Sequence, residues 1–164
     1  MSRNLRVALL ALAAILIVWL FVGRDRGIEG QVRKQIDEVR RLVGKLPGEN
    51  NLESLNKARK ISELFSTDFE FVAPQFDFAT RDRRALVGAI HEYRSRSGTV
   101  AMLTRDVEVS VDEAARRATV HLIAEFVTGA DDLVGREAYA FQINCKEEND
   151  EWRIDYVRLL DVLE

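Results

Sequence analysis

His121 and Glu125 are the two side chains whose types and spacing most resemble an acid and base pair. They lie four residues apart in an alternating segment, so they share one face of an expected strand. At ~3.3 Å per residue the two are separated by about 13 Å, which is too far for a direct hydrogen bond. The apolar residues of this segment occupy its other face. We therefore expect His121 and Glu125 at an exposed surface or a dimer interface, not in a catalytic site.

The other side chains that commonly bind metals or act as nucleophiles are isolated in the sequence. His91 has no second histidine or cysteine near it, so we interpret it as a helix-surface residue. Cys145 is the only cysteine, which excludes an intramolecular disulfide and a cysteine metal cluster. Its spacing from Phe141 and Ile143 indicates a buried, unreactive thiol. Phosphate-loop, nucleophile-elbow and dinucleotide motifs are absent from the sequence, so we predict no metal site, no cofactor and no catalytic residue.

Five arginines surround one expected helix: Arg81, Arg83, Arg84, Arg94 and Arg96. They could bind lipid head groups or an acidic partner. Their division between the two ends of the helix favours an ordinary solvated surface instead. The chain has 24 basic and 27 acidic residues, a formal net charge of −3. This balance argues against a general nucleic-acid-binding protein, so no nucleic-acid partner is predicted.

Aromatic residues recur at strand and helix spacing from residue 69 onward. Such residues can line a ligand cavity, but at strand spacing they more often fill a core. The candidates for lining a cavity are Phe69, Phe71, Tyr93, Phe126, Tyr139, Phe141, Trp152 and Tyr156.

The helices and strands that would hold these residues come after an apolar run from Val7 to Val22. At ~1.5 Å rise per residue this run covers about 24 Å as a helix, enough to cross a bilayer if Arg6 reaches toward the head groups. No small-x-small cleavage site follows the run, which favours an uncleaved anchor over a signal peptide. We therefore divide the chain into a short tail (1–6), a transmembrane anchor (7–23) and one folded domain (28–164).

The charges that flank the apolar run are nearly balanced, with Arg3 and Arg6 before it and Arg24 and Arg26 after it. Large domains translocate largely regardless of such charges. We expect a single-pass protein of a bacterial inner membrane whose C-terminal domain lies in the periplasm. The lipid bilayer is then the first expected partner.

Within the domain the hydrophobic pattern changes from helical to alternating. Spacings of three and four predict helices over 28–46, 52–65 and 83–94. Between the second and third helices we expect a short strand over 68–72 and then a loop. Alternation after residue 106 predicts a meander of long strands joined by short turns at 112–115, 129–135 and 146–151, with the third strand beginning at Tyr139. The predicted fold is α+β, with three helices packed on a curved antiparallel sheet that forms a cone, preceded by one transmembrane helix.

Four motifs, in this order, resemble the nuclear transport factor 2-like superfamily of cystatin-like α+β cones. They are LFSTDFEFVAP (64–74), RDRRALVGAIHEY (81–93), DVEVSVDEAARRATVHL (106–122) and EWRIDYV (151–157). The resemblance covers about Leu52 to Val162 and implies that the last strand closes the cone. The superfamily includes ketosteroid isomerase, scytalone dehydratase and polyketide cyclases, so the fold alone does not determine an activity.

The resemblance also implies where an isomerase would carry its catalytic groups. Its general base is the aspartate immediately before the proline of the first-strand motif, and here Ala73 precedes Pro74. Its oxyanion donors are a tyrosine on the first helix and an acid on a late strand. No tyrosine precedes Tyr93, and residues 138–145 contain no acid. These differences favour a protein that is not an enzyme of that type.

Two hypotheses about function follow. The first is a membrane-anchored module for protein association or ligand binding in the bacterial cell envelope, forming a homodimer or binding another envelope protein. Its dimer face would be His121, Ile123, Glu125 and Val127, on the outer side of the sheet. The alternative is a small-molecule isomerase or dehydratase-like enzyme that uses the cone cavity.

Overall fold

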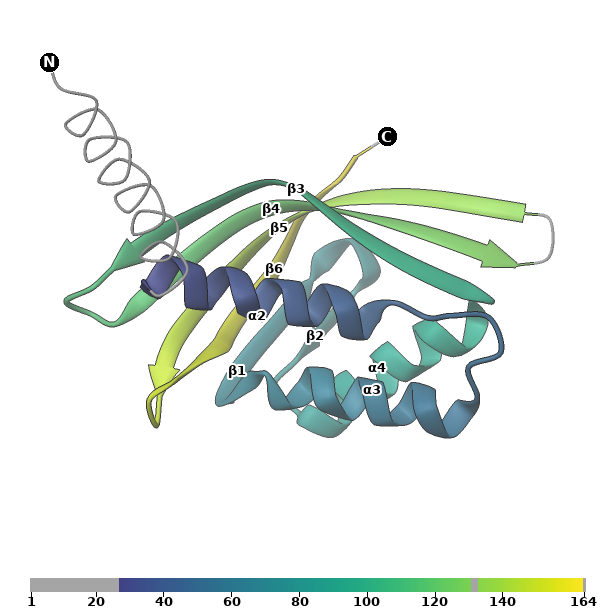
Figure 1. The fold of residues 1–164 in the computed structure, drawn as a ribbon, viewed down its shortest axis with the longest axis horizontal. Helices are drawn as coiled ribbons and strands as arrows, with labels where there is room; N and C mark the ends of the chain where they lie inside the picture. The colour runs from purple at the N-terminus through teal and green to yellow at the C-terminus, as the bar shows by residue number, and fades with distance from the viewer. Residues whose placement is uncertain (1–26, 131–132, 164) are drawn as a thin grey trace, which may run out of the picture.

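The computed structural model describes residues 27–130 and 133–163. Helices α2 (Ile28–Val43) and α3 (Asn51–Glu63) come first, then strand β1 (Phe65–Ala73), the 3-10 turn η1 (Pro74–Phe76), strand β2 (Phe78–Thr80) and helix α4 (Arg83–Arg96). The chain continues with strands β3 (Thr99–Asp112), β4 (Arg117–Ala130), β5 (Leu133–Glu148) and β6 (Glu151–Leu163). Figure 1 shows the helices gathered on one side of a curved sheet. The predicted α+β class is confirmed.

Local side-chain chemistry explains where two of the helices begin. The Asn50 side chain accepts a hydrogen bond from the backbone N–H of Glu53 at 2.9 Å, and the Glu53 carboxylate accepts from the backbone N–H of Asn50 at 3.2 Å. This reciprocal pair is a capping box at the start of α3. Asp82 starts α4 in a similar way, because its carboxylate accepts from the backbone N–H of Arg84 at 2.8 Å.

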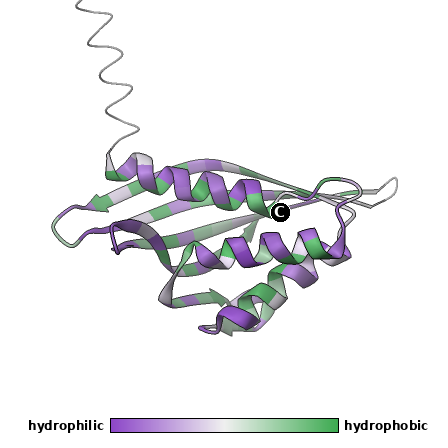
Figure 2. Ribbon diagram, turned by 60° about the horizontal axis from the view of Figure 1, so that its bottom comes forward, coloured by the Kyte–Doolittle hydropathy of each residue, from purple (hydrophilic) through white to green (hydrophobic). Residues whose placement is uncertain are grey.

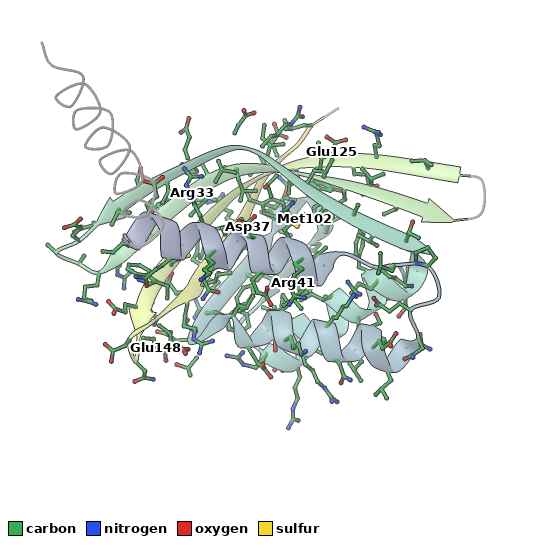
Figure 3. The ribbon with its side chains drawn as sticks, in the orientation of Figure 1. Arg33, Asp37, Arg41, Met102, Glu125 and Glu148 are labelled. Carbon is green, nitrogen blue, oxygen red and sulfur yellow. The ribbon has the colours of Figure 1, made fainter. Side chains whose placement is uncertain are left out.

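Helix α2 is amphipathic, as its spacing predicts. Val32, Ile36 and Leu42 are buried against the sheet, and Figure 2 shows polar and apolar positions alternating along the helix. Its exposed side carries charged residues such as Arg33 and Arg41 (Figure 3). The helix therefore covers one face of the sheet along its length and leaves the other face open.

The helix α2 ends at Val43, earlier than the predicted end at residue 46. The reason is a backbone contact that the sequence pattern does not contain. The N–H of Lys45 donates to the carbonyl of Val100 at 2.8 Å, and the N–H of Val100 donates to the carbonyl of Lys45 at 3.1 Å. This bridge ties the α2–α3 loop to the edge strand β3.

The sheet has the strand order β2-β1-β6-β5-β4-β3. Strands β3 to β6 form antiparallel hairpins, as their short turns predict. The last turn is Asn149–Asp150, two residues with positive φ that suit a two-residue hairpin. The prediction of a wholly antiparallel sheet was wrong, because β1 pairs with β6 in parallel. Turn length constrains only strands that are consecutive in the chain, and these two are not.

Several strands are longer than their apolar alternation indicates. Strand β3 begins at Thr99, well before the alternating valines, and β5 begins at Leu133 inside the predicted turn 129–135. The short strand β2, which pairs with β1 through Phe71↔Thr80, was expected to be a loop. Backbone pairing with a long neighbour extends these strands through residues whose side chains do not alternate.

The core lies between the helices and the concave face of the sheet. On β4 the buried side chains are Ala118, Val120, Leu122 and Ala124, the apolar set that the sequence predicts. Phe69 from β1 and Trp152 from β6 join them. The interior of the cone is therefore filled by packed side chains over much of its length.

The predicted anchor at residues 7–23 lies outside the described residues. In residues 27–130 and 133–163, no helix is both long and apolar enough to cross a membrane.

Candidate functional site

Two of the five arginines around α4 are structural. Arg94 is fully buried and donates hydrogen bonds to the carbonyls of Leu42 at 2.8 Å and Gly44 at 3.1 Å, and to Ser54 Oγ at 3.2 Å. It also forms an ion pair with Glu49. The guanidinium thus satisfies the free carbonyls at the end of α2 and joins α2, α3 and α4.

Arg83 has a comparable role at the end of α3. It donates to the carbonyls of Phe65 at 3.1 Å and Ser66 at 3.2 Å, and also to that of Ser62. Of the five arginines, only Arg81, Arg84 and Arg96 remain exposed. The candidate basic surface for lipid head groups or an acidic partner is correspondingly reduced.

An open hollow of about 520 Å³ lies over α3 and the α2–α3 loop, lined by residues that include Glu49 and Lys57. Lys57 donates to Glu49 at 2.7 Å and to the carbonyl of Gly44 at 3.1 Å. Lys57 and Glu49 are thus already engaged in holding the loop. We assign this hollow no ligand.

The concave face carries a connected set of partly exposed aromatic rings from four elements. Tyr93 of α4 contacts Phe126 of β4, with ring centroids 6.0 Å apart, and Phe126 contacts Tyr139 of β5 at 5.8 Å. Tyr139 in turn contacts Phe76 of η1 at 6.0 Å and Phe141 at 6.3 Å. All of these pairs are edge-to-face, the arrangement that the ring quadrupoles favour.

Glu137 adds a carboxylate to these rings. It pairs with Phe126 in the β4–β5 register and so lies on the concave face, and its Oε2 accepts a hydrogen bond from the Tyr139 hydroxyl at 2.7 Å. Burial raises the pKa of Tyr139, and the hydrogen bond to Glu137 and its charge raise it further. Burial, then the charge of Glu137, also raises the pKa of Tyr93. Both phenols therefore stay protonated at neutral pH, so each has an O–H to donate, and that of Tyr139 is donated to Glu137.

Glu137 is not among the predicted site residues, because the predicted turn covers 129–135 and the predicted strand begins at Tyr139. A signal was present, since Glu137, Tyr139 and Phe141 alternate at strand spacing. Extending the strand by two residues would have placed the carboxylate beside the tyrosine.

The other predicted cavity residues lie in three different environments. Phe69 and Trp152 are buried in the core, at 1% and 4% exposure. Phe71 packs against Phe78 of β2, with ring centroids 5.9 Å apart. Tyr156 lies on the opposite face, because a β-bulge shifts the register so that it pairs with Asn144 while Ile154 pairs with Cys145. The structure therefore does not bring all eight aromatics together.

The position where an isomerase would hold its general base carries a methyl group here. Ala73 is 5% exposed and ends strand β1.

The isolated cysteine and histidine do not form a reactive site within the described residues. Cys145 is 1% exposed, and burial, with the charge of Asp155, raises the pKa of its thiol to about 12. Nδ1 of His91 is buried without a hydrogen-bond partner among the described residues. No group of histidine, cysteine or carboxylate side chains suited to a metal ion occurs in residues 27–130 and 133–163.

The outer face of the sheet holds the residues predicted to form a dimer contact. His121, Ile123, Glu125 and Val127 alternate with the buried residues of β4 and so project away from the helices. The side chain of Glu125 lies on that face (Figure 3). Its carboxylate forms an ion pair with the guanidinium of Arg136 on β5, with Oε1 and Nη1 3.0 Å apart. These four residues thus share one surface, separate from the aromatic rings.

The sequence of residues 55–158 matches the family of SnoaL-like domains. No curated protein sequence matches the chain. Among solved structures, a nuclear transport factor 2-like protein with a cystatin-like fold from Novosphingobium aromaticivorans has a TM-score of 0.65 at 20% identity, covering 89% of this chain and 88% of its own.

Two further structures have the same fold. A putative scytalone dehydratase from Novosphingobium aromaticivorans has a TM-score of 0.62 at 11% identity, covering 82% of this chain and 83% of its own. ActVI-ORFA from Streptomyces coelicolor has a TM-score of 0.64 at 10% identity, covering 81% of this chain and 96% of its own. At these identities the likeness establishes the fold and leaves the activity open.

Proposed function

The chain belongs to the family of SnoaL-like domains, and we propose that it acts as a membrane-tethered association module that pairs with a second copy of itself. The pairing surface is the outer face of strands β3 to β6, which we call the outer sheet face. The observation that carries this proposal is that the described helices all pack on the opposite face (Figure 1). A sheet face with apolar residues and no covering layer is a common place for a partner to bind.

The outer sheet face carries several apolar side chains among its charged ones. Ile123 lies between Arg105 of β3 and Ala140 of β5, and Val127 lies between Ala101 and Arg136. Leu103, the neighbour of Glu125, is 50% exposed. These side chains form a patch that a second apolar surface would remove from water, which is the main favourable contribution to association.

The charges around this apolar patch favour a second copy over a partner of one charge sign. Basic residues Arg105, Arg136 and Arg158 share the face with acidic residues Glu108, Glu125 and Asp161. In a two-fold interface the same surface of both copies makes the contact, so basic residues of one copy can face acidic residues of the other. A surface that carries both signs can therefore complement itself.

The apolar run Val7–Val22 supports the tether. Confining two copies to one membrane raises their effective concentration, so a modest interface is sufficient to give a dimer. We place the domain in the periplasm of a bacterial inner membrane, because insertion as a signal anchor would put the C-terminal side outside and large domains translocate largely regardless of the flanking charges. Another envelope protein bound to the same face would be a competing occupant.

The enzymatic alternative, an isomerase or dehydratase-like activity, has weaker support. It requires a proton acceptor facing the interior, and Ala73 supplies none. Glu137 lies on the concave face but is exposed and already accepts the Tyr139 hydroxyl. This arrangement provides a hydrogen-bond donor and an aromatic surface without a buried base.

The test is the mass of the full chain in mild detergent, measured by light scattering coupled to size exclusion. We expect a dimer, and we expect Val127→Asp to convert it to a monomer because it places a new carboxylate among the apolar side chains of that face. Leu52→Asp is the matched control, since Leu52 is 66% exposed on α3 in the other layer. A wild-type monomer, or equal dimer content in both variants, would refute the pairing.

A further inference from the structure

The aromatic rings of the concave face form a site that the association proposal does not use. We call Phe76, Tyr93, Phe126 and Tyr139, together with the carboxylate of Glu137, the aromatic box. Its rings come from η1, α4, β4 and β5, so elements distant in the sequence build it jointly. Phe76 is 60% exposed and Tyr93 is 36% exposed, so a small molecule can reach it from solvent.

Neighbouring rings of the aromatic box stand at steep angles to one another. The interplanar angles are 79° between Tyr93 and Phe126, 65° between Phe126 and Tyr139, and 65° between Tyr139 and Phe76. Each ring packs edge-to-face against the next, so the four rings form one connected aromatic surface. Part of this surface is exposed at Phe76 and Tyr93, and the face of each ring carries negative potential that attracts a cation.

The charged member of the aromatic box is a carboxylate. Glu137 is exposed and accepts a hydrogen bond from the Tyr139 hydroxyl. No basic side chain within the described part of the chain forms an ion pair with it. By contrast, Glu125 on the outer sheet face forms an ion pair with Arg136. The aromatic box therefore presents a carboxylate and ring faces that complement a cation.

We propose that the aromatic box binds an alkylated ammonium group, of the kind carried by choline-type compounds. Ring faces attract such a cation, and Glu137 supplies the opposite charge. A quaternary ammonium has no N–H donors and a weakly held hydration shell. A primary ammonium is a compact and strongly hydrated charge, so it loses more of its hydration against ring faces and fits less well.

The binding experiment uses the full chain in detergent and titrates it with choline, followed by saturation-transfer NMR or calorimetry. The comparison ligand is 3,3-dimethyl-1-butanol, which has the shape of choline without its charge. We expect millimolar-range binding of choline and weaker binding of the alcohol, by roughly three- to tenfold, as expected for cation–π and ionic contacts at a partly exposed site. Equal binding of the two ligands, or no binding of choline, would overturn the proposal.

Two pairs of variants locate the site. Tyr93→Phe keeps the ring and should bind choline as the wild type does, whereas Tyr93→Leu removes it and should weaken binding about three- to tenfold. Glu137→Gln should weaken choline binding and leave the alcohol unaffected. Glu113→Gln, exposed in the turn between β3 and β4, is its control and should change neither. Circular dichroism confirms folding of each variant, and Tyr93→Leu binding as tightly as Tyr93→Phe would contradict the site.

The same chemistry can come from a free amine or from a lipid head group. Full-length protein in phosphatidylcholine nanodiscs distinguishes the two sources from protein in phosphatidylglycerol nanodiscs. If choline binds only in phosphatidylglycerol, the lipid head group already occupies the aromatic box. If it binds equally in both, the ligand is a free amine. Because the aromatic box and the outer sheet face lie on opposite sides of the sheet, failure here leaves the dimer proposal untouched.

Discussion

The buried guanidinium of Arg94 forms an ion pair with the carboxylate of Glu49, and the two side chains are 0% and 5% exposed. The pair lies where α4, the end of α2 and the α2–α3 loop meet. A charge in such a place is stable only while its partners are present, because removing one leaves the other without water or counter-ion. This contact therefore fixes the helical layer over the sheet.

Replacing Arg94 should destabilise the domain strongly. Arg94→Met should lower the free energy of unfolding by about 3–5 kcal/mol, since Glu49 and the carbonyls of Leu42 and Gly44 lose their donor. Arg94→Lys should not restore it, because an ammonium cannot reach several acceptors in fixed directions. Arg84→Met, on the exposed side of the same helix, should stay within about 0.5 kcal/mol. Thermal or urea unfolding measures these changes, and equal effects at both positions would contradict the role of Arg94.

Glu49 should make the domain sensitive to acid. Burial alone would raise the pKa of Glu49, but hydrogen bonds from Lys57 and Arg94 and their charges lower it below the ordinary value of 4.5. A lowered folded-state pKa adds stability above the unfolded-state value, and that stability disappears as the pH falls through the folded-state value. The melting temperature of the wild type should therefore exceed that of Glu49→Gln at neutral pH and approach it in acid. A difference that does not depend on pH would refute this account.

Asp155 should destabilise the domain at neutral pH, whereas Glu49 stabilises it there. Its Oδ1 is buried without a hydrogen-bond partner among the described residues, and its nearest ion-pair contact, Arg117, is 3.7 Å away. Burial raises the pKa of Asp155, although Arg117 and Lys146 partly counteract the rise. A raised folded-state pKa means that the stability is present at low pH and is lost as the pH rises through that value. Asp155→Asn should thus raise the melting temperature at neutral pH, and a lower melting temperature there would count against the assignment.

The fold was largely predictable because hydrophobic spacing reports which faces are buried. The buried alternation of β4 and the amphipathic α2 follow directly from the positions of Val120, Leu122, Val32 and Ile36. The parallel pairing of β1 with β6 was not predictable in this way, because a strand's own pattern does not identify a neighbour that is distant in the chain. The bulge that moves Tyr156 to the outer face is a local shift in the β5–β6 register, which the alternation of Trp152, Ile154 and Tyr156 does not show.

The candidate sites were predictable only in part. The aromatic residues were visible in the sequence, but which of them meet depends on how η1 and α4 pack over the sheet. Glu137 was not predicted, because the strand was expected to begin at Tyr139 and in fact begins at Leu133. Arg94 was counted as a surface charge, because nothing in its neighbourhood in the sequence shows that Leu42, Ser54 and Glu49 surround it. Long-range contacts of this kind decide whether a charged side chain is structural or available to a ligand.

Disulfide cross-linking of the full chain in intact membranes tests the central claim most directly. Cys145 is buried and its thiol pKa is raised to about 12, so it contributes little background. We predict that Ile123→Cys, at the centre of the outer sheet face, forms a covalent dimer on mild oxidation, while Leu52→Cys on α3 does not. Cross-linking through Leu52→Cys alone, or through neither position, would contradict a dimer built on the outer sheet face.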